Sequence, residues 1–159
     1  MSILEQLLAR LRRRKPARCA IVVGDGQFNF DVASTAQQRF ELERLCSGRT
    51  QDPYKCPALL IPQPTNARGP DTVAVLIGDA TVGYLQHTAA LVFLSALRAG
   101  EFDRAACGAM IVGQPDPQHG DQAFRVRLDA ELPFTLADPA NRTASDQKDA
   151  DSGHNPIAE

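Results

Sequence analysis

Tryptophan is absent from the 159-residue chain, and aromatic residues make up only 6% of it. An aromatic side chain in a loop or at a strand end is therefore worth weighing as a binding residue. No apolar run approaches the length of a membrane span. Residues 1–15 are not a secretory signal, because Glu5 and Arg10 break their apolar part and the basic residues follow it. We expect a cytoplasmic protein without membrane contact.

Zinc-binding and catalytic motifs are also missing. The cysteines, Cys19, Cys46, Cys56 and Cys107, form no C-x-x-C pair, and no histidine lies near them at ligand spacing. We therefore expect reduced thiols and no metal site. Gly24-Asp25-Gly26 does not continue as G-x-G-x-x-G, and there is no P-loop or nucleophile motif. We expect no cofactor and no enzymatic activity.

Neither sign of charge dominates the chain. It has 17 Lys and Arg against 19 Asp and Glu, and a formal net charge of −2. This balance gives no overall attraction for nucleic acid, so a basic surface would have to be local. One such cluster runs from Arg10 to Arg18. It either suits the C-terminus of a preceding helix or contacts phosphate or an acidic membrane.

Two strand-like runs organise the middle of the chain. Val73–Ile77 and Ala80–Leu85 are apolar, and Gly78-Asp79 between them predicts a β-hairpin with a two-residue turn. Other strands must complete the sheet, since a hairpin is not stable alone. The polar loop before it, Asn66 to Asp71, would lie at the mouth of that sheet, a common place for a binding site.

Apolar positions at helical spacing predict three helices. In helix 2–14, Ile3, Leu7, Leu8 and Leu11 share one face. The other two helices cover residues 34–47 and 88–99. We expect Ser34 or Thr35 to cap the second, with Phe40, Leu42 and Leu45 as its apolar positions. We expect His87 or Thr88 to cap the third and Gly100 to end it; this helix is apolar nearly all round and should cover a barrel end.

Further strands are expected at 19–23, 55–62, 105–112 and 123–128. Prolines in 55–62 favour either an edge strand there or a strand bounded by prolines. The segment 113–121 is rich in turn residues and is expected to be a loop. The chain thus predicts an α+β fold with a basic amphipathic helix in 1–15, an ordered domain at 19–136 and a disordered tail at 138–159.

Four short motifs, in this order, resemble the HIRAN domain family, of the stand-alone bacterial type. They are Val22-Val23-Gly24, Asn66, Val73-Ala74-Val75 and Val82-Gly83-Tyr84-Leu85. The last motif, after the hairpin turn, is the most telling. The resemblance implies a small OB/SH3-like antiparallel β-barrel with covering helices. It also implies binding of single-stranded DNA, particularly its 3′ end.

The resemblance implies a nucleic-acid-binding face in which bases stack on rings and polar groups hold phosphate. Phe28 falls at the family's aromatic after the first strand, Asn66 matches the Asn of its Asn-Pro-Tyr-Asp loop, and Tyr84 matches the aromatic or His of Val-Gly-His/Tyr-Leu. The full set of candidate residues is Phe28, Asn66, Arg68, Asp71, Tyr84 and His87.

The chain departs from the family in its loops. Gly26 and Gln27 stand where some members have Arg and Tyr, so a cation and a ring are missing there. Arg68 stands at the Tyr of Asn-Pro-Tyr-Asp, and Gly69 stands at its Asp. Asp71 is a substitute carboxylate two residues on, which leaves preference for a 3′ end open. These changes are still compatible with a groove that binds single strands without a preference for the 3′ end.

Structural alternatives exist for these residues. Asn66 and Asp71 suit the side-chain-to-backbone bonds of any tight loop. Arg68 can be a solvated charge, and His87 can cap a helix. Tyr84 can pack its ring beside Phe93 with its hydroxyl in water. For the whole protein, the alternative is a protein-interaction or regulatory module without nucleic-acid binding, in which helix 2–14 docks a partner.

Overall fold

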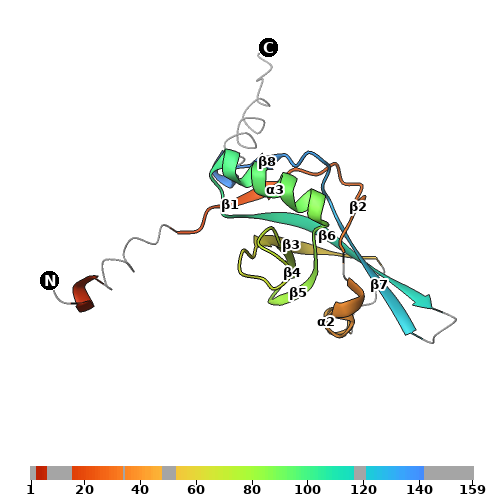
Figure 1. Cartoon of the computed structure of the whole chain (residues 1–159). Coiled ribbons are helices and arrows are strands. Elements are labelled where there is room, and N and C mark those ends of the chain that lie inside the picture. The colour runs from red at the N-terminus through yellow and green to blue at the C-terminus, as the bar shows by residue number, and fades with distance from the viewer. Residues whose placement is uncertain (1–2, 7–15, 34, 48–52, 117–120, 142–159) are drawn as a thin grey trace, which may run out of the picture.

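A computed structural model describes residues 3–6, 16–33, 35–47, 53–116 and 121–141, and it shows a mixed α+β fold around a strongly curled antiparallel sheet (Figure 1). In chain order the elements are β1 (Cys19–Val22), β2 (Phe30–Asp31), the 3₁₀ helix η1 (Thr35–Gln38), α2 (Arg39–Cys46), β3 (Tyr54–Pro62), β4 (Val73–Ile77), β5 (Ala80–Tyr84), α3 (His87–Gly100), β6 (Arg104–Asp116), β7 (Asp121–Leu128) and β8 (Leu136–Ala137). Residues 3–6 are helical, and the rest of the predicted helix 2–14 lies outside the described residues.

The sheet curls until its two ends meet. Its strands follow the order β2-β7-β6-β3-β4-β5, and β1 runs parallel to β6 beside β8. Val32 donates its N–H to Val126 in β7 (3.0 Å), and Ala33 exchanges two hydrogen bonds with Tyr84 in β5 (2.9 and 3.0 Å). The short segment after β2 therefore bonds both to β7, the neighbour of β2, and to β5 at the other end of the strand path.

The core lies inside this curl and beneath α3. Aliphatic side chains from β3 to β7 fill it, and Phe93 of α3 meets Phe134 edge-on at a centroid distance of 5.4 Å. Helix α3 lies beside β8, whereas α2 lies near β5 and β7 (Figure 1). Leu91 and Val92 are exposed, so α3 buries one face although its sequence is apolar nearly all round.

Most predicted strands are confirmed, with two corrections. Of the two alternatives for β3, the edge strand is wrong, because β3 lies between β6 and β4; the strand does end at a proline, Pro62. Pro57 has no N–H to donate, and its position in the sheet does not require one. Its partner in β6, Gly108, accepts a hydrogen bond at its carbonyl from the N–H of Asp129 (2.8 Å), and β4 pairs with β3 only from Leu59 onward. The second correction is the predicted loop 113–121, since β6 continues to Asp116 and β7 begins at Asp121.

The predicted helices at 34–47 and 88–99 are confirmed, but their ends differ. Thr35 does not cap α2, because its hydroxyl donates to the carbonyl of Phe124 (3.3 Å); Ser34 lies outside the described residues. Gln86, not His87 or Thr88, is the N-cap of α3, and Glu101, with a left-handed φ of 57°, ends it in place of Gly100. No helix in the described ranges is long and apolar enough to cross a membrane.

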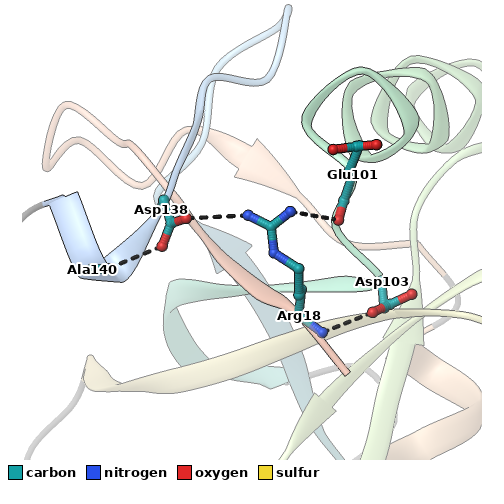
Figure 2. Close-up of polar contacts among 5 residues, drawn as sticks. All are labelled: Arg18, Glu101, Asp103, Asp138 and Ala140. Atoms are coloured by element: carbon teal, nitrogen blue, oxygen red, sulfur yellow. Dashed lines mark hydrogen bonds and ion pairs between the residues drawn. The ribbon is translucent and has the colours of Figure 1, made fainter. Parts of the chain in front are cut away.

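The predicted tail begins too early. Asp138 accepts a hydrogen bond from Arg18 (3.1 Å), and its other carboxylate oxygen accepts from the N–H of Ala140 (3.0 Å) at the start of a helical turn (Figure 2). A carboxylate at the N-cap position followed by a proline, here Asp138 and Pro139, is a typical start of a helix. Residues 142–159 of the predicted tail lie outside the described residues.

Candidate functional site

The loop between β3 and β4 is shaped by its own polar groups. The side-chain oxygen of Asn66 accepts from the N–H of Arg68 (2.9 Å), and its amide donates to the side chain of Gln63 (2.7 Å). The Asn66 carbonyl accepts from the N–H of Gly69, whose φ of 132° few other residues adopt. The structural interpretation of Asn66 is confirmed: it builds the turn that presents Arg68.

A pocket of about 370 Å³ opens beside this loop. It lies where the loop, the end of β5 and the start of α3 meet, and it brings together four of the six candidate residues. Its lining residues are Arg68, Gly69, Pro70, Asp71, Thr72, Tyr84, Leu85 and His87. The Thr72 hydroxyl donates to the Gly69 carbonyl (2.8 Å) and so holds the far end of the loop.

Arg68 and Tyr84 form the aromatic wall of the pocket. The Arg68 guanidinium carbon lies 4.2 Å from the centroid of the Tyr84 ring, and its Nη2 donates to the side chain of Gln37 in η1 (2.9 Å). A cation over an aromatic face at this distance is attracted by the ring. Arg68 is therefore a positioned cation and not merely a solvated loop charge.

The backbone around Tyr84 is fixed on both sides. Tyr84 pairs with Ala33, and the next residue, Leu85, donates its N–H to Val73 (3.0 Å). Gly83 permits the crossing, because a Cβ there would lie 2.4 Å from Val32 and 2.6 Å from the carbonyl of Ala33. The Val-Gly-Tyr-Leu motif thus sets the ring at the pocket.

Helix α3 begins at the pocket with His87. Its N-cap residue, Gln86, makes no side-chain cap hydrogen bond. The first N–H groups of a helix have no partner within the helix, and they favour a negative charge at this end. His87 and Arg68 therefore flank a part of the pocket that suits an anion, whereas Asp71 places a carboxylate at its loop side.

Phe28 is not at this pocket. It has a left-handed φ of 53°, and its ring lies 5.0 Å from the Lys55 ammonium. It lines a second hollow of about 450 Å³ on β3 and β6, with mainly apolar neighbours such as Ile21 and Pro57. The structure does not bring Phe28 together with Arg68 and Tyr84 in one groove.

Carboxylates gather beside Phe28. Asp129 accepts from the N–H of Gly26 (2.8 Å), and Asp25 accepts from the N–H of Gln27 (2.9 Å). A hydrogen bond to Asp25 and the negative charge of the same group raise the pKa of Glu131, and the charge of Asp129 adds to this. Negative charge at this loop disfavours a phosphate next to Phe28.

Sequence reasoning missed Gln37, which holds the guanidinium of Arg68. The two residues are 31 positions apart, and no local pattern links them. In the described part of the chain, no three His, Cys, Asp or Glu side chains gather as a possible metal site. No disulfide bond joins Cys19, Cys46, Cys56 and Cys107 in the described chain.

No protein family model matches the chain, and neither a curated protein nor a solved structure matches it.

Proposed function

We propose that this protein is a nucleic-acid-binding module that takes single-stranded DNA, or a DNA end, at the pocket between loop 66–71 and strand end 82–85. The observation that carries the proposal is the Arg68 guanidinium stacked 4.2 Å above the Tyr84 ring, in a pocket that His87 and Asp71 also line. The site binds and does not catalyse. The curled sheet is then a small OB/SH3-like barrel of the HIRAN type.

The chemistry of the pocket suits an unpaired nucleotide. Bases stack on aromatic rings and on guanidinium planes, and the Arg68–Tyr84 pair offers both. A phosphate would meet the charge of Arg68 and the N–H groups at the start of α3. This local positive charge answers the objection that the chain as a whole carries a charge of −2.

Preference for a 3′ end would depend on Asp71. A carboxylate can accept a hydrogen bond from a terminal hydroxyl group. Asp71 lines the pocket, although Gly69 occupies the position at which the family has its Asp. Asp71 is therefore the residue that would distinguish a free 3′ end from a blocked one.

The test is fluorescence anisotropy with labelled single-stranded oligonucleotides, with free and blocked 3′ ends, over a salt series. We expect Tyr84→Ala to weaken binding by about 1–3 kcal/mol, since it removes a stacking surface. Tyr84→Phe keeps the ring and should bind as the wild type does. Arg68→Ala should also lower the slope of log affinity against log salt by about 1, because one phosphate contact is lost.

Phe28→Ala is a matched aromatic control outside the pocket and should leave affinity unchanged. If the wild-type protein binds no oligonucleotide at low salt, the proposal is wrong. The protein-interaction module is then the better interpretation. Ile3 and Leu4, which are 78% and 70% exposed, are apolar residues that a partner could contact; Leu7 and Leu11 lie outside the described residues.

A further inference from the structure

Phe40 has the largest exposed fraction of the exposed large hydrophobic side chains in the described chain, at 83%. It sits in α2, whose buried residue Leu42 anchors the helix to the core. In a helix, a residue two positions from the buried one points to nearly the opposite side. Phe40 therefore adds nothing to the core, and its ring is available to a ligand.

Helix α2 has a fixed place relative to the pocket. Just before the helix, Gln37 of η1 accepts a hydrogen bond from Arg68 (2.9 Å), and the Arg68 guanidinium lies over the Tyr84 ring. Near the C-terminus of α2, Arg44 Nη2 lies 3.4 Å from a carboxylate oxygen of Asp79 in the β4–β5 turn. The helix thus runs along β5, from the pocket end of that strand towards its turn.

Phe40 lies next to the pocket along this line. It follows Gln37 by three residues, across the junction of η1 and α2, and residues at this spacing lie only about 5–6 Å apart along the axis of either helix type. The order along the surface is therefore Tyr84, Arg68, Gln37 and Phe40. The Phe40 ring therefore lies beyond the Arg68 guanidinium, next to the wall of the pocket.

We propose that Phe40 is a second stacking platform for the same single-stranded nucleic acid, one that takes a base beyond the nucleotide in the pocket. This inference rests on the proposed function and extends the site from one nucleotide to a short strand. The occupant is single-stranded nucleic acid because the exposed ring continues a surface that already holds a stacked cation and ring. Exposed aromatic rings at such spacing serve strands of any sequence.

The charges around Phe40 indicate that its contribution is stacking and not phosphate binding. Arg39 is paired with Glu43 (2.8 Å), and Arg44 is paired with Glu41 (2.8 Å). These neighbouring cations are therefore balanced by carboxylates on the same helix. Loss of the Phe40 ring should weaken binding without changing its salt dependence, unlike the loss of Arg68.

The experiment compares a short oligothymidylate of about two nucleotides with one of about eight, both within or below the usual site size of such proteins. In anisotropy titrations of the full chain, Phe40→Ala should weaken the longer strand about 5- to 100-fold. It should leave the short strand and the salt slope unchanged. Phe40→Tyr should bind as the wild type does, and Phe40→Leu should resemble Phe40→Ala, because only a ring stacks.

Leu132→Ala, at an exposed apolar side chain in the β7–β8 connection, is the matched control and should change neither affinity. The inference is overturned if Phe40→Ala leaves the longer strand unaffected, or if Phe40→Leu binds as tightly as the wild type. Failure of the proposed function looks different, because the wild type would then bind neither strand. Binding of both strands with equal affinity, unchanged by Phe40→Ala, would overturn the second platform alone.

Discussion

Cys107 packs as an ordinary core residue, but the pKa of its thiol is strongly raised. Its side chain faces the core of the sheet and is 4% exposed, and its Sγ donates to the carbonyls of Gly108 (3.3 Å) and Asp129 (3.5 Å). Burial raises the pKa of the thiol to about 12, and the negative charge of Asp129 adds to this. The residue therefore acts as a small apolar group and not as a nucleophile.

This pKa shift predicts a loss of stability at alkaline pH. The folded pKa lies above the unfolded value, so the stabilisation is complete below about pH 9 and is lost as the pH rises towards 12. At pH 10 the loss from this one thiol is about 1 kcal/mol. Urea unfolding of Cys107→Ala should show a smaller drop between pH 8 and pH 10 than the wild type shows.

The control lies within the same titration. Between pH 6 and pH 8 the wild type and Cys107→Ala should differ by a constant amount, which reflects the altered packing. A parallel decline of both proteins from pH 8 to pH 10 would contradict the prediction.

At this scale the sequence predicts burial well and exposure poorly. Cys107 lies in an apolar run of the sequence, and it is buried in the core. Phe40 was expected among the apolar positions of its helix and is instead exposed. The reason is that Phe40 lies two positions before the buried Leu42 in the same α-helix, so the two side chains point to nearly opposite sides.

Among the elements, β5 and the segment after β2 cross at short range. Ala33 exchanges its hydrogen bonds with Tyr84, while the neighbouring Gly83 lies against Val32. The crossing joins the two ends of the curled sheet and also fixes the ring of the candidate site. Both the fold and the pocket therefore depend on the absence of a side chain at Gly83.

Gly83→Ala should destabilise the protein by about 1–3 kcal/mol, the usual cost of added volume in a packed core. The new Cβ would stand 2.4 Å from Val32 and 2.6 Å from a backbone carbonyl, which cannot simply rotate away. Gly108→Ala is the matched strand control, because its Cβ would come no closer than 3.4 Å to Asp129. Urea midpoints measure both, and equal midpoints for the two variants would contradict this account of Gly83.

Element prediction succeeded where local chemistry decides the structure. The hairpin of β4 and β5 was predicted from Gly78-Asp79, and Gly78 indeed has a positive φ of 63°. The prediction failed where pairing between strands decides the structure. Strands β6 and β7 stay paired as far as Asp116 and Asp121, although residues 113–121 are rich in Gly and Pro. The join between Ala33 and Tyr84 had no sequence signal, because a single bridge leaves no periodic pattern.

Across the whole molecule, Arg18 ties together three parts of the chain that are distant in sequence (Figure 2). Its backbone N–H donates to the carboxylate of Asp103 (2.7 Å), and its guanidinium donates to the carbonyl of Glu101 (3.2 Å) and to Asp138 (3.1 Å). The same guanidinium lies 4.8 Å from the centroid of the Phe102 ring. It thereby connects the start of β1 with the end of α3 and with the chain that follows β8.

A double-mutant cycle can separate these contacts. Asp138→Asn removes the charge but keeps an oxygen that can accept from the N–H of Ala140. It should cost about 0.2–1 kcal/mol, because the Arg18 and Asp138 side chains are 49% and 33% exposed and solvent weakens their attraction. Arg18→Ala should cost more, since it also removes the hydrogen bond to Glu101 and the stacking on Phe102.

Salt distinguishes the two kinds of contact. The coupling energy between Arg18 and Asp138, obtained from urea unfolding of both single variants and the double variant, should shrink as salt is added. The remaining cost of Arg18→Ala should persist, because the carbonyl hydrogen bond and the ring contact are not ion pairs. If the whole effect of Arg18→Ala vanished in high salt, Arg18 would be only one partner of a surface ion pair. If it persists, the contacts with Glu101 and Phe102 hold the start of β1 to the end of α3, and the pair with Asp138 adds the chain after β8.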